Sequence, residues 1–236
     1  MSLRAVKRMI IALAAIIAAA FVAVHFVYPL VEPAAFQYRV GGVDVSHHQG
    51  DIDWEALKAD GVEFAYIKAS EGENFNDPRF SRNWFAAEQA GMLRGAYHFF
   101  TQCRSGAAQA RNFIRVVPKD PKALPPAIDA EHMGPCREGA AVRDVPAEIT
   151  IYLKAVYAHY GKRPIIYTTR QFHDAHLAGK FAKERFWIRS LILAPRFRQQ
   201  QWLFWQYHNR GRRRGIAGPV DLNVFRGTRS ELEALR

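Results

Sequence analysis

Beyond residue 40, short apolar runs alternate with amphipathic stretches along the chain. The apolar runs predict eight strands, which cover residues 42–46, 63–69, 93–100, 126–131, 163–168, 185–189, 203–207 and 220–225. The amphipathic stretches predict helices at residues 53–59, 77–90, 105–116 and 146–160, with a weaker one at 171–182. Such alternation favours a parallel sheet with covered faces. Because helices are missing among the last three strands, we predict an α/β fold, a modified TIM-like β/α barrel with eight strands and reduced helices in the second half.

The N-terminus carries a long apolar segment. Residues 9–24 contain no charged side chain, and the basic residues Arg4, Lys7 and Arg8 precede them. About 20 apolar residues can span a bilayer, whereas the apolar region of a signal peptide has about 7–15. We therefore predict a transmembrane signal anchor at residues 9–31, with a basic cytoplasmic flank at residues 1–8. A cleaved signal peptide is the alternative, because Ala18–Ala20 offers a small-residue cleavage site.

The rest of the chain divides into a linker at residues 32–39 and a barrel domain at residues 40–236. About 200 residues are enough for one domain with a sizeable core. We expect this domain in the periplasm or outside the cell, attached to the inner membrane through the N-terminal segment. Secretion is the alternative, and we expect a monomer.

The chain is basic, with 33 basic and 22 acidic residues and a formal net charge of +11. Such a charge favours polyanions such as nucleic acid, anionic lipid or an acidic cell-wall polymer. Four arginines gather in one late loop, at positions 210, 212, 213 and 214. This cluster is either a solvated loop or a contact for an acidic polymer. Export and the lack of a nucleic-acid-binding motif count against nucleic acid as a partner.

Carboxylates lie where the predicted strands meet the barrel mouth. Asp129 and Glu131 share one face of the fourth strand, because alternate side chains of a strand point the same way. Two acids on one face suit glycoside hydrolysis. Chemistry in a parallel barrel collects at the C-terminal ends of the strands. We therefore expect Asp44 of the first strand and Asp221 of the eighth to join them, with Trp187, Trp205 and tyrosines as walls.

Six motifs resemble the family 25 glycoside hydrolases, the Chalaropsis-type lysozymes or N-acetylmuramidases. They occur in order over residues 40–227, at Gly42–Gly50, Tyr66–Gly72, Gly95–Phe99, Ile128–Glu131, Trp205–Tyr207 and Asp221–Asn223. The resemblance implies a modified β/α barrel that hydrolyses the β-1,4 bond between N-acetylmuramic acid and N-acetylglucosamine in peptidoglycan. A non-catalytic barrel that binds peptidoglycan or another glycan is the alternative.

The resemblance also implies roles for individual residues. Glu131 matches the general acid, and Asp129 matches the partner that orients the N-acetyl group of the substrate. Asp44 and Asp221 match two further acids. The expected substrate contacts are Tyr97, Tyr167, Trp205, Gln206 and Lys68. Because Asp129 and Glu131 are too close to hold a water between them, we favour assistance by the acetamido oxygen of the substrate.

No cofactor or metal is expected. The adjacent His47 and His48 point apart on a strand, and no third ligand is spaced with them. Two segments depart from the family pattern, residues 189–193 and the basic loop 210–215, and we expect neither to touch the acids. Cys103 and Cys136 follow the third and fourth strands, whose loops adjoin in a barrel. We predict a disulfide between them, with two free thiols as the alternative.

Overall fold

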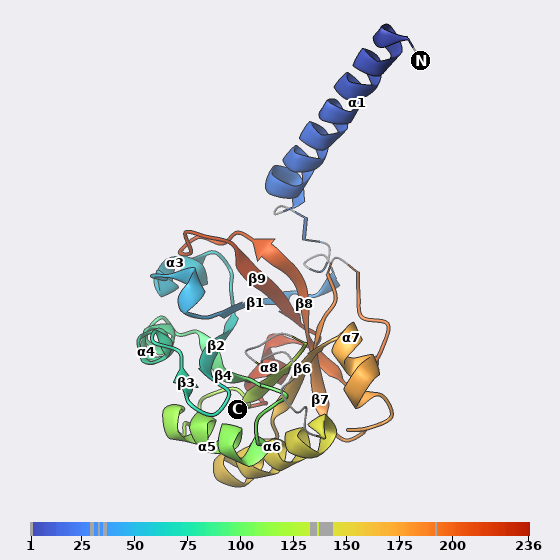
Figure 1. Ribbon diagram of the computed structural model, residues 1–236. Coiled ribbons are helices and arrows are strands. Elements are labelled where there is room, and N and C mark those ends of the chain that lie inside the picture. The colour runs from blue at the N-terminus through green and yellow to red at the C-terminus, as the bar shows by residue number, and fades with distance from the viewer. Residues whose placement is uncertain are drawn as a thin grey trace.

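Strands of a single sheet close into a barrel beneath a projecting N-terminal helix (Figure 1). The computed structural model describes residues 2–28, 31–32, 34, 37–132, 136, 144–191 and 193–236. The barrel strands are β1 (Val40–Val45), β2 (Phe64–Glu71), β4 (Leu93–Phe99), β5 (Ala127–Ala130), β6 (Ile165–Thr169), β7 (Arg185–Arg189), β8 (Trp202–Gly211) and β9 (Val220–Phe225). Parallel pairing of β1 with β2 closes the ring. The eight predicted strands and the barrel are thus confirmed.

The last barrel strand runs against its neighbours. β9 pairs antiparallel with both β1 and β8, whereas the other contacts around the ring are parallel. The expectation of an all-parallel sheet is therefore wrong at this strand. Parallel neighbours need a crossover of about a dozen residues or more, and residues 212–219 are too short a connection to return the chain.

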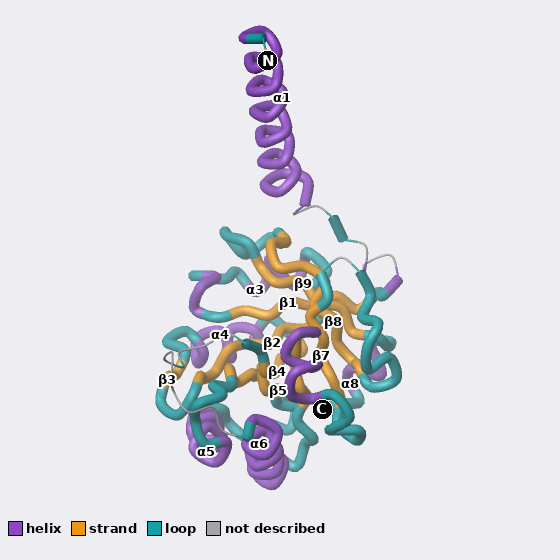
Figure 2. Tube along the Cα trace, turned by 45° about the vertical axis from the view of Figure 1, so that its right-hand side comes forward, coloured by secondary structure: helices purple, strands orange, loops and turns teal. Residues whose placement is uncertain are grey.

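Helices cover the first half of the barrel. They are α3 (Trp54–Ala59), α4 (Phe80–Gln89), α5 (Gly106–Val116) and α6 (Val145–Tyr160), and α5 and α6 lie side by side outside the strands (Figure 2). Asp144 caps the start of α6, and Gly161 in the left-handed conformation ends it. The weaker predicted helix is the short α7 (Arg170–Phe172) followed by a π-helical turn at His173–Leu177. Among the described residues no helix lies between β7 and β9, as the sequence predicts.

Two short elements lie outside the predicted pattern. β3 (Phe75–Asn76) pairs antiparallel with the end of β2, and α8 (Arg229–Glu233) follows β9. Both are too short to produce a periodic signal in the sequence.

Strand alternation separates an inner core from an outer one. Phe64 and Tyr66 of β2 point into the barrel, whereas Ala65 and Ile67 face the surrounding helices. The inner rings fit because two neighbouring strands carry glycine opposite them. A Cβ on Gly42 or Gly95 would lie 2.4 Å from the ring of Phe64 or Tyr66, respectively. These glycines therefore make room for aromatic rings that fill the barrel.

The N-terminal helix α1 (Leu3–Val22) projects away from the barrel in both views (Figures 1 and 2). Its apolar segment at residues 4–22 has a mean hydropathy of 2.2, and none of this segment is buried. This fits either a signal anchor or a signal peptide. Described residues of the predicted linker pack on the barrel. Ala34 is buried, and the ring of Tyr38 meets Trp202 and Trp205 edge to face.

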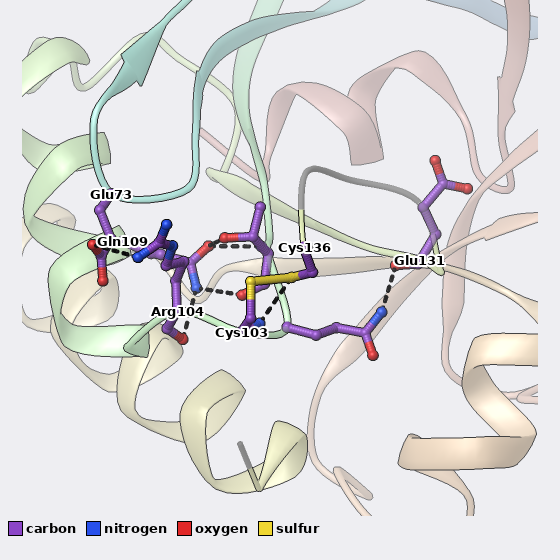
Figure 3. Close-up of a disulfide and its surroundings, with 8 residues drawn as sticks. Glu73, Cys103, Arg104, Gln109, Glu131 and Cys136 are labelled. Carbon is purple, nitrogen blue, oxygen red and sulfur yellow. Dashed lines mark hydrogen bonds and ion pairs between the residues drawn. A yellow bond between two sulfur atoms is a disulfide. The ribbon is translucent and has the colours of Figure 1, made fainter. Parts of the chain in front are cut away.

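The structure contains the predicted disulfide between Cys103 and Cys136, with the two Cα atoms 5.8 Å apart (Figure 3). It ties the loop after β4 to the segment after β5. Gln102, next to Cys103, donates from Nε2 to the backbone carbonyl of Glu131 at 3.5 Å. The Glu131 side chain is directed away from the disulfide (Figure 3). The disulfide therefore supports the backbone of this region and does not contact the Glu131 carboxylate.

Candidate active site

A groove of about 500 Å³ opens at the barrel mouth, where the parallel strands end. Each of the eight long strands contributes inward-pointing side chains to its wall, because every second residue of a strand faces the interior. Asp44, Asp129, Glu131 and Asp221 all line this groove. The structure therefore brings the four predicted acids together from β1, β5 and β9.

Asp221 reaches the mouth for a reason that differs from the predicted one. It lies at the start of β9, and because β9 is antiparallel its start meets the C-terminal ends of the other strands. Asp221 is the cross-strand partner of Asp44 on β1. Because β9 is reversed, Asp221 lies at the groove. At the start of a parallel strand it would have lain at the opposite end of the barrel.

Asp44 is held by two side-chain amides. Its Oδ2 accepts hydrogen bonds from Gln206 Nε2 at 2.9 Å and from Asn223 Nδ2 at 2.7 Å. The hydroxyl of Tyr167 donates to Gln206 Oε1 at 3.0 Å, and the indole N–H of Trp187 donates to Asn223 Oδ1 at 2.8 Å. Because an indole N–H only donates, it turns the amide nitrogen of Asn223 toward Asp44. This network stabilises Asp44 in its ionised form.

In the described part of the chain, Asp129 and Glu131 are not held by side-chain amides as Asp44 is. Oδ1 of Asp129 is buried and has no hydrogen-bond partner among the described residues. Glu131 lies just beyond the end of β5, and its Oε2 is 3.4 Å from Nη1 of Arg189. Both side chains therefore have acceptor or donor capacity that a molecule in the groove can use.

Burial is the first cause of a raised pKa in all four acids, because it disfavours the charged form. Burial and then the charge of Glu131 raise the pKa of Asp129 well above its usual range. Burial and then the charge of Asp44 raise the pKa of Asp221 to about 9. Burial also raises the pKa of Glu131, and the positive charge of Arg189 opposes that rise. The groove consequently retains protons near neutral pH.

Residues 43–216 match the family described as Glycosyl hydrolases family 25. The chain belongs to this family. It is 38% identical to "Lysozyme M1" of Streptomyces globisporus over 208 residues, which are 83% of this chain and 71% of the relative.

Solved structures of family 25 proteins share the fold. A family 25 glycosyl hydrolase from Bacillus anthracis is 40% identical, with a TM-score of 0.75 and coverage of 84% of this chain and 93% of its own. The lysozyme from Streptomyces coelicolor is 37% identical, with a TM-score of 0.77 and coverage of 83% and 96%. The reduced helical cover is thus shared with related barrels.

In this family 25 chain, four of the five expected substrate contacts line the groove: Lys68, Tyr97, Tyr167 and Gln206. Trp205 does not, and its expected placement there is corrected. Because Gln206 points inward, its neighbour Trp205 points outward into the outer core, where its indole N–H donates to the carbonyl of Ser190 at 2.6 Å. Trp187 is the tryptophan that lines the groove.

Arg189 and Asn209 line the groove although the sequence analysis did not propose them, and Arg189 contacts one of the acids. The expectation that residues 189–193 do not touch the acids is wrong, because the Arg189 guanidinium contacts Glu131. The signal was present: Trp187 and Arg189 are two positions apart on one strand and so share a face. Of the rest of this segment, Ile192 lies outside the described residues.

Among the described residues no group of three or more His, Cys, Asp and Glu side chains is arranged to hold a metal ion. His47 instead pairs with the buried Asp77, with 2.7 Å between Nδ1 and Oδ2. His47 therefore has a structural partner. The expectation that His47 and His48 point apart on a strand is wrong, because His47–Gln49 form a 3-10 helical turn and the two ring centroids lie 4.0 Å apart.

Proposed function

We propose that this protein is a membrane-anchored N-acetylmuramidase that hydrolyses the β-1,4 bond between N-acetylmuramic acid and N-acetylglucosamine in peptidoglycan. Membership of family 25 and the lysozyme relatives support a glycoside hydrolase of this class. One observation carries the reaction: a glutamic acid with a raised pKa shares the groove with Asp129, whose buried Oδ1 has no hydrogen-bond partner in the part of the chain that the structure describes. A barrel that only binds glycan has no need for such a pair and is not favoured.

In the proposed reaction, Glu131 gives its proton to the glycosidic oxygen as the bond from C1 of muramic acid to that oxygen breaks. The acetamido carbonyl oxygen of the same sugar bonds to C1, and the released N-acetylglucosamine end keeps the proton. Water then attacks C1 and restores the acetamide, while ionised Glu131 takes the proton from that water.

Asp129 supports this sequence by accepting the acetamido N–H at its free Oδ1. A hydrogen bond to the charged form lowers a carboxyl pKa, so substrate binding favours ionised Asp129. The proton of the pair is then left on Glu131, where the reaction uses it. The two amides that donate to Asp44 favour its ionised form and oppose the burial that raises its pKa, and in that form Asp44 stabilises the positive charge that develops at C1.

The N-terminal segment supports anchoring. After the apolar helix, the ring of Tyr28 stacks on His208, with 4.2 Å between the ring centroids. Glu32 accepts two hydrogen bonds from Arg213, at 2.6 and 2.7 Å. These contacts hold the chain that follows the helix against β8 and the loop after it, so the barrel stays close to the membrane. N-terminal sequencing of the mature protein from membrane and soluble fractions tests this; an N-terminus beyond residue 18 in all of the protein would contradict a retained anchor.

The activity is tested with the full-length protein in detergent micelles and purified peptidoglycan between pH 4 and 8. We expect new reducing ends, and product mass analysis should place muramic acid at those ends. Glu131→Gln should lower their release about 10³-fold, whereas Glu55→Gln, at an exposed acid of α3, should leave it unchanged. A wild-type protein without activity across this range, or a Glu131→Gln variant that loses less than about tenfold, would overturn the proposal.

A further inference from the structure

The groove is strongly acidic but holds two cations, Lys68 and Arg189. Lys68 is already neutralised: its Nζ lies 2.6 Å from Glu71 Oε2 and also over the ring of Phe99. Arg189 differs. Among the described residues, the only hydrogen bond or ion pair of its side chain is the 3.4 Å approach of Nη1 to Glu131 Oε2, which is longer than the 2.7–2.9 Å typical of a charge-assisted hydrogen bond.

The position of Arg189 is fixed by the end of β7. The backbone N–H of the next residue, Ser190, donates to the carbonyl of Gln206 at 3.1 Å, and the Ser190 carbonyl accepts from the Trp205 indole. The side chain of Arg189 is 29% exposed, so it is held at the lip of the groove while still open to solvent. A guanidinium has five N–H donors in a planar fork that fits a carboxylate. Among the described residues, most of these donors have no partner.

The proposed substrate carries a matching group. Muramic acid differs from N-acetylglucosamine by a lactyl ether that ends in a carboxyl group, and the peptides attached to it carry carboxylates of their own. We propose that Arg189 is a specificity-determining residue that binds a carboxylate of the muramic acid unit or its peptide, and that this binding releases Glu131 for proton donation. This inference rests on the muramidase function proposed above.

The release follows from the competition for one guanidinium. In the empty groove Arg189 favours ionised Glu131. The other titratable groups around this pair are Tyr28 of the N-terminal segment, Asp44 on β1, Lys68 on β2, Asp129 on β5, His132 after it, Tyr167 on β6 and Asp221 on β9. Of these, the acids oppose ionisation of Glu131. A substrate carboxylate that takes Arg189 therefore leaves Glu131 among acids, where it holds its proton. Binding of a substrate that carries this carboxylate thus keeps Glu131 protonated and ready to donate.

Two matched substrate pairs test this with the full-length protein in micelles. The first is peptide-free glycan with its lactyl carboxylates free or converted to methylamides. The second is peptide-bearing glycan with its peptide carboxylates free or amidated. Wild type should prefer the free acid by about tenfold in kcat/KM in at least one pair, which identifies the source of the carboxylate. Arg189→Gln should lose the preference, largely through KM, and Arg189→Lys should retain only part of it because lysine lacks the fork.

The pH profile gives a second readout. In Arg189→Gln the alkaline limb of kcat/KM, which reports the free enzyme, should move to higher pH, because the cation that favours ionised Glu131 is gone. Arg189→Lys should keep that limb near its wild-type position. Arg185→Gln, at an exposed arginine on the same strand, should change neither preference nor profile. If wild type cleaves glycan but Arg189→Gln keeps both its preference and its alkaline limb, this inference fails alone. If wild type cleaves nothing, the proposed function fails.

Discussion

The two sides of the groove hold their acids in different ways. On the β1–β9 side, two amides donate to Asp44, and Tyr167 and Trp187 orient those amides in turn. On the β5–β7 side, and among the residues that the structure describes, Asp129 has an oxygen without a hydrogen-bond partner and the Glu131 carboxylate has one long contact, to Arg189. An acid that accepts hydrogen bonds from oriented amides is favoured in its charged form, whereas an acid with open bonding capacity can exchange a proton with a substrate. The contrast therefore assigns the moving proton to the β5–β7 side.

The strongest test of the contrast is a change on the proton-exchanging side. Glu131→Gln keeps the shape of the side chain but cannot give a proton, so kcat/KM on peptidoglycan should fall about 10³-fold, as for loss of a general acid. Binding of glycan to the inactive variant should persist, which calorimetry measures. A loss below tenfold would place the proton donor elsewhere.

A change on the β1–β9 side, where amides hold Asp44, should lower activity less and should shift the pH dependence of the reaction. Asn223→Leu removes one donor to Asp44, and we expect a loss of about tenfold in kcat/KM, the value of one hydrogen bond to a charged group. Because that bond lowers the pKa of Asp44, its loss raises the pKa, and the acidic limb of the pH–rate profile should move to higher pH. An acidic limb that stays in place would show that Asp44 is not required in its ionised form.

The disulfide tests how far the β5 side depends on support from its loops. Reduction, or the pair of changes Cys103→Ser and Cys136→Ser, should lower the free energy of unfolding by about 2–4 kcal/mol. The acids belong to the strands and their ends, so activity of the folded fraction should change less than stability. Thermal unfolding with and without reductant measures the effect; an unchanged midpoint would contradict a stabilising role.

Asp221 adds a dependence of stability on pH. Its pKa is raised to about 9 in the folded protein, above the ordinary value of about 4 in the unfolded chain. Its contribution is therefore fully present below about pH 4 and is lost as pH rises toward 9. Asp221→Asn should raise the melting temperature more at pH 8 than at pH 4. An equal shift at both values would contradict the raised pKa.

The smallest effect separates the two tryptophans. Trp187→Phe should raise KM for glycan, because Trp187 lines the groove and holds Asn223. Trp205→Phe should raise KM much less than Trp187→Phe, because Trp205 supports the end of β7 from outside the groove, and it should lower stability by about 1 kcal/mol for the lost indole hydrogen bond. A rise in KM as large as that of Trp187→Phe would return Trp205 to the substrate site.

Much of the site can be predicted from the sequence, because the direction of a side chain on a strand depends on its position within a few residues. The period of two places Asp129 and Glu131 on one face, and the same period places Trp187 with Arg189 and separates Trp205 from Gln206. The shared face of Trp187 and Arg189 and the opposite faces of Trp205 and Gln206 thus also follow from the sequence pattern. A resemblance to family motifs suggests a role for each residue, but it does not show whether the side chain points into the groove or out of the barrel.

The sequence by itself determined the strand positions, the reduced helical cover, the family and the identity of the four acids. Tertiary structure decided that β9 is reversed, that Asp221 faces Asp44, and that the Arg189 guanidinium meets Glu131. The physical reason is range. Side-chain alternation is set within a few residues, whereas strand direction, ring closure and the contact between β5 and β7 depend on connections and packing between segments far apart in the chain.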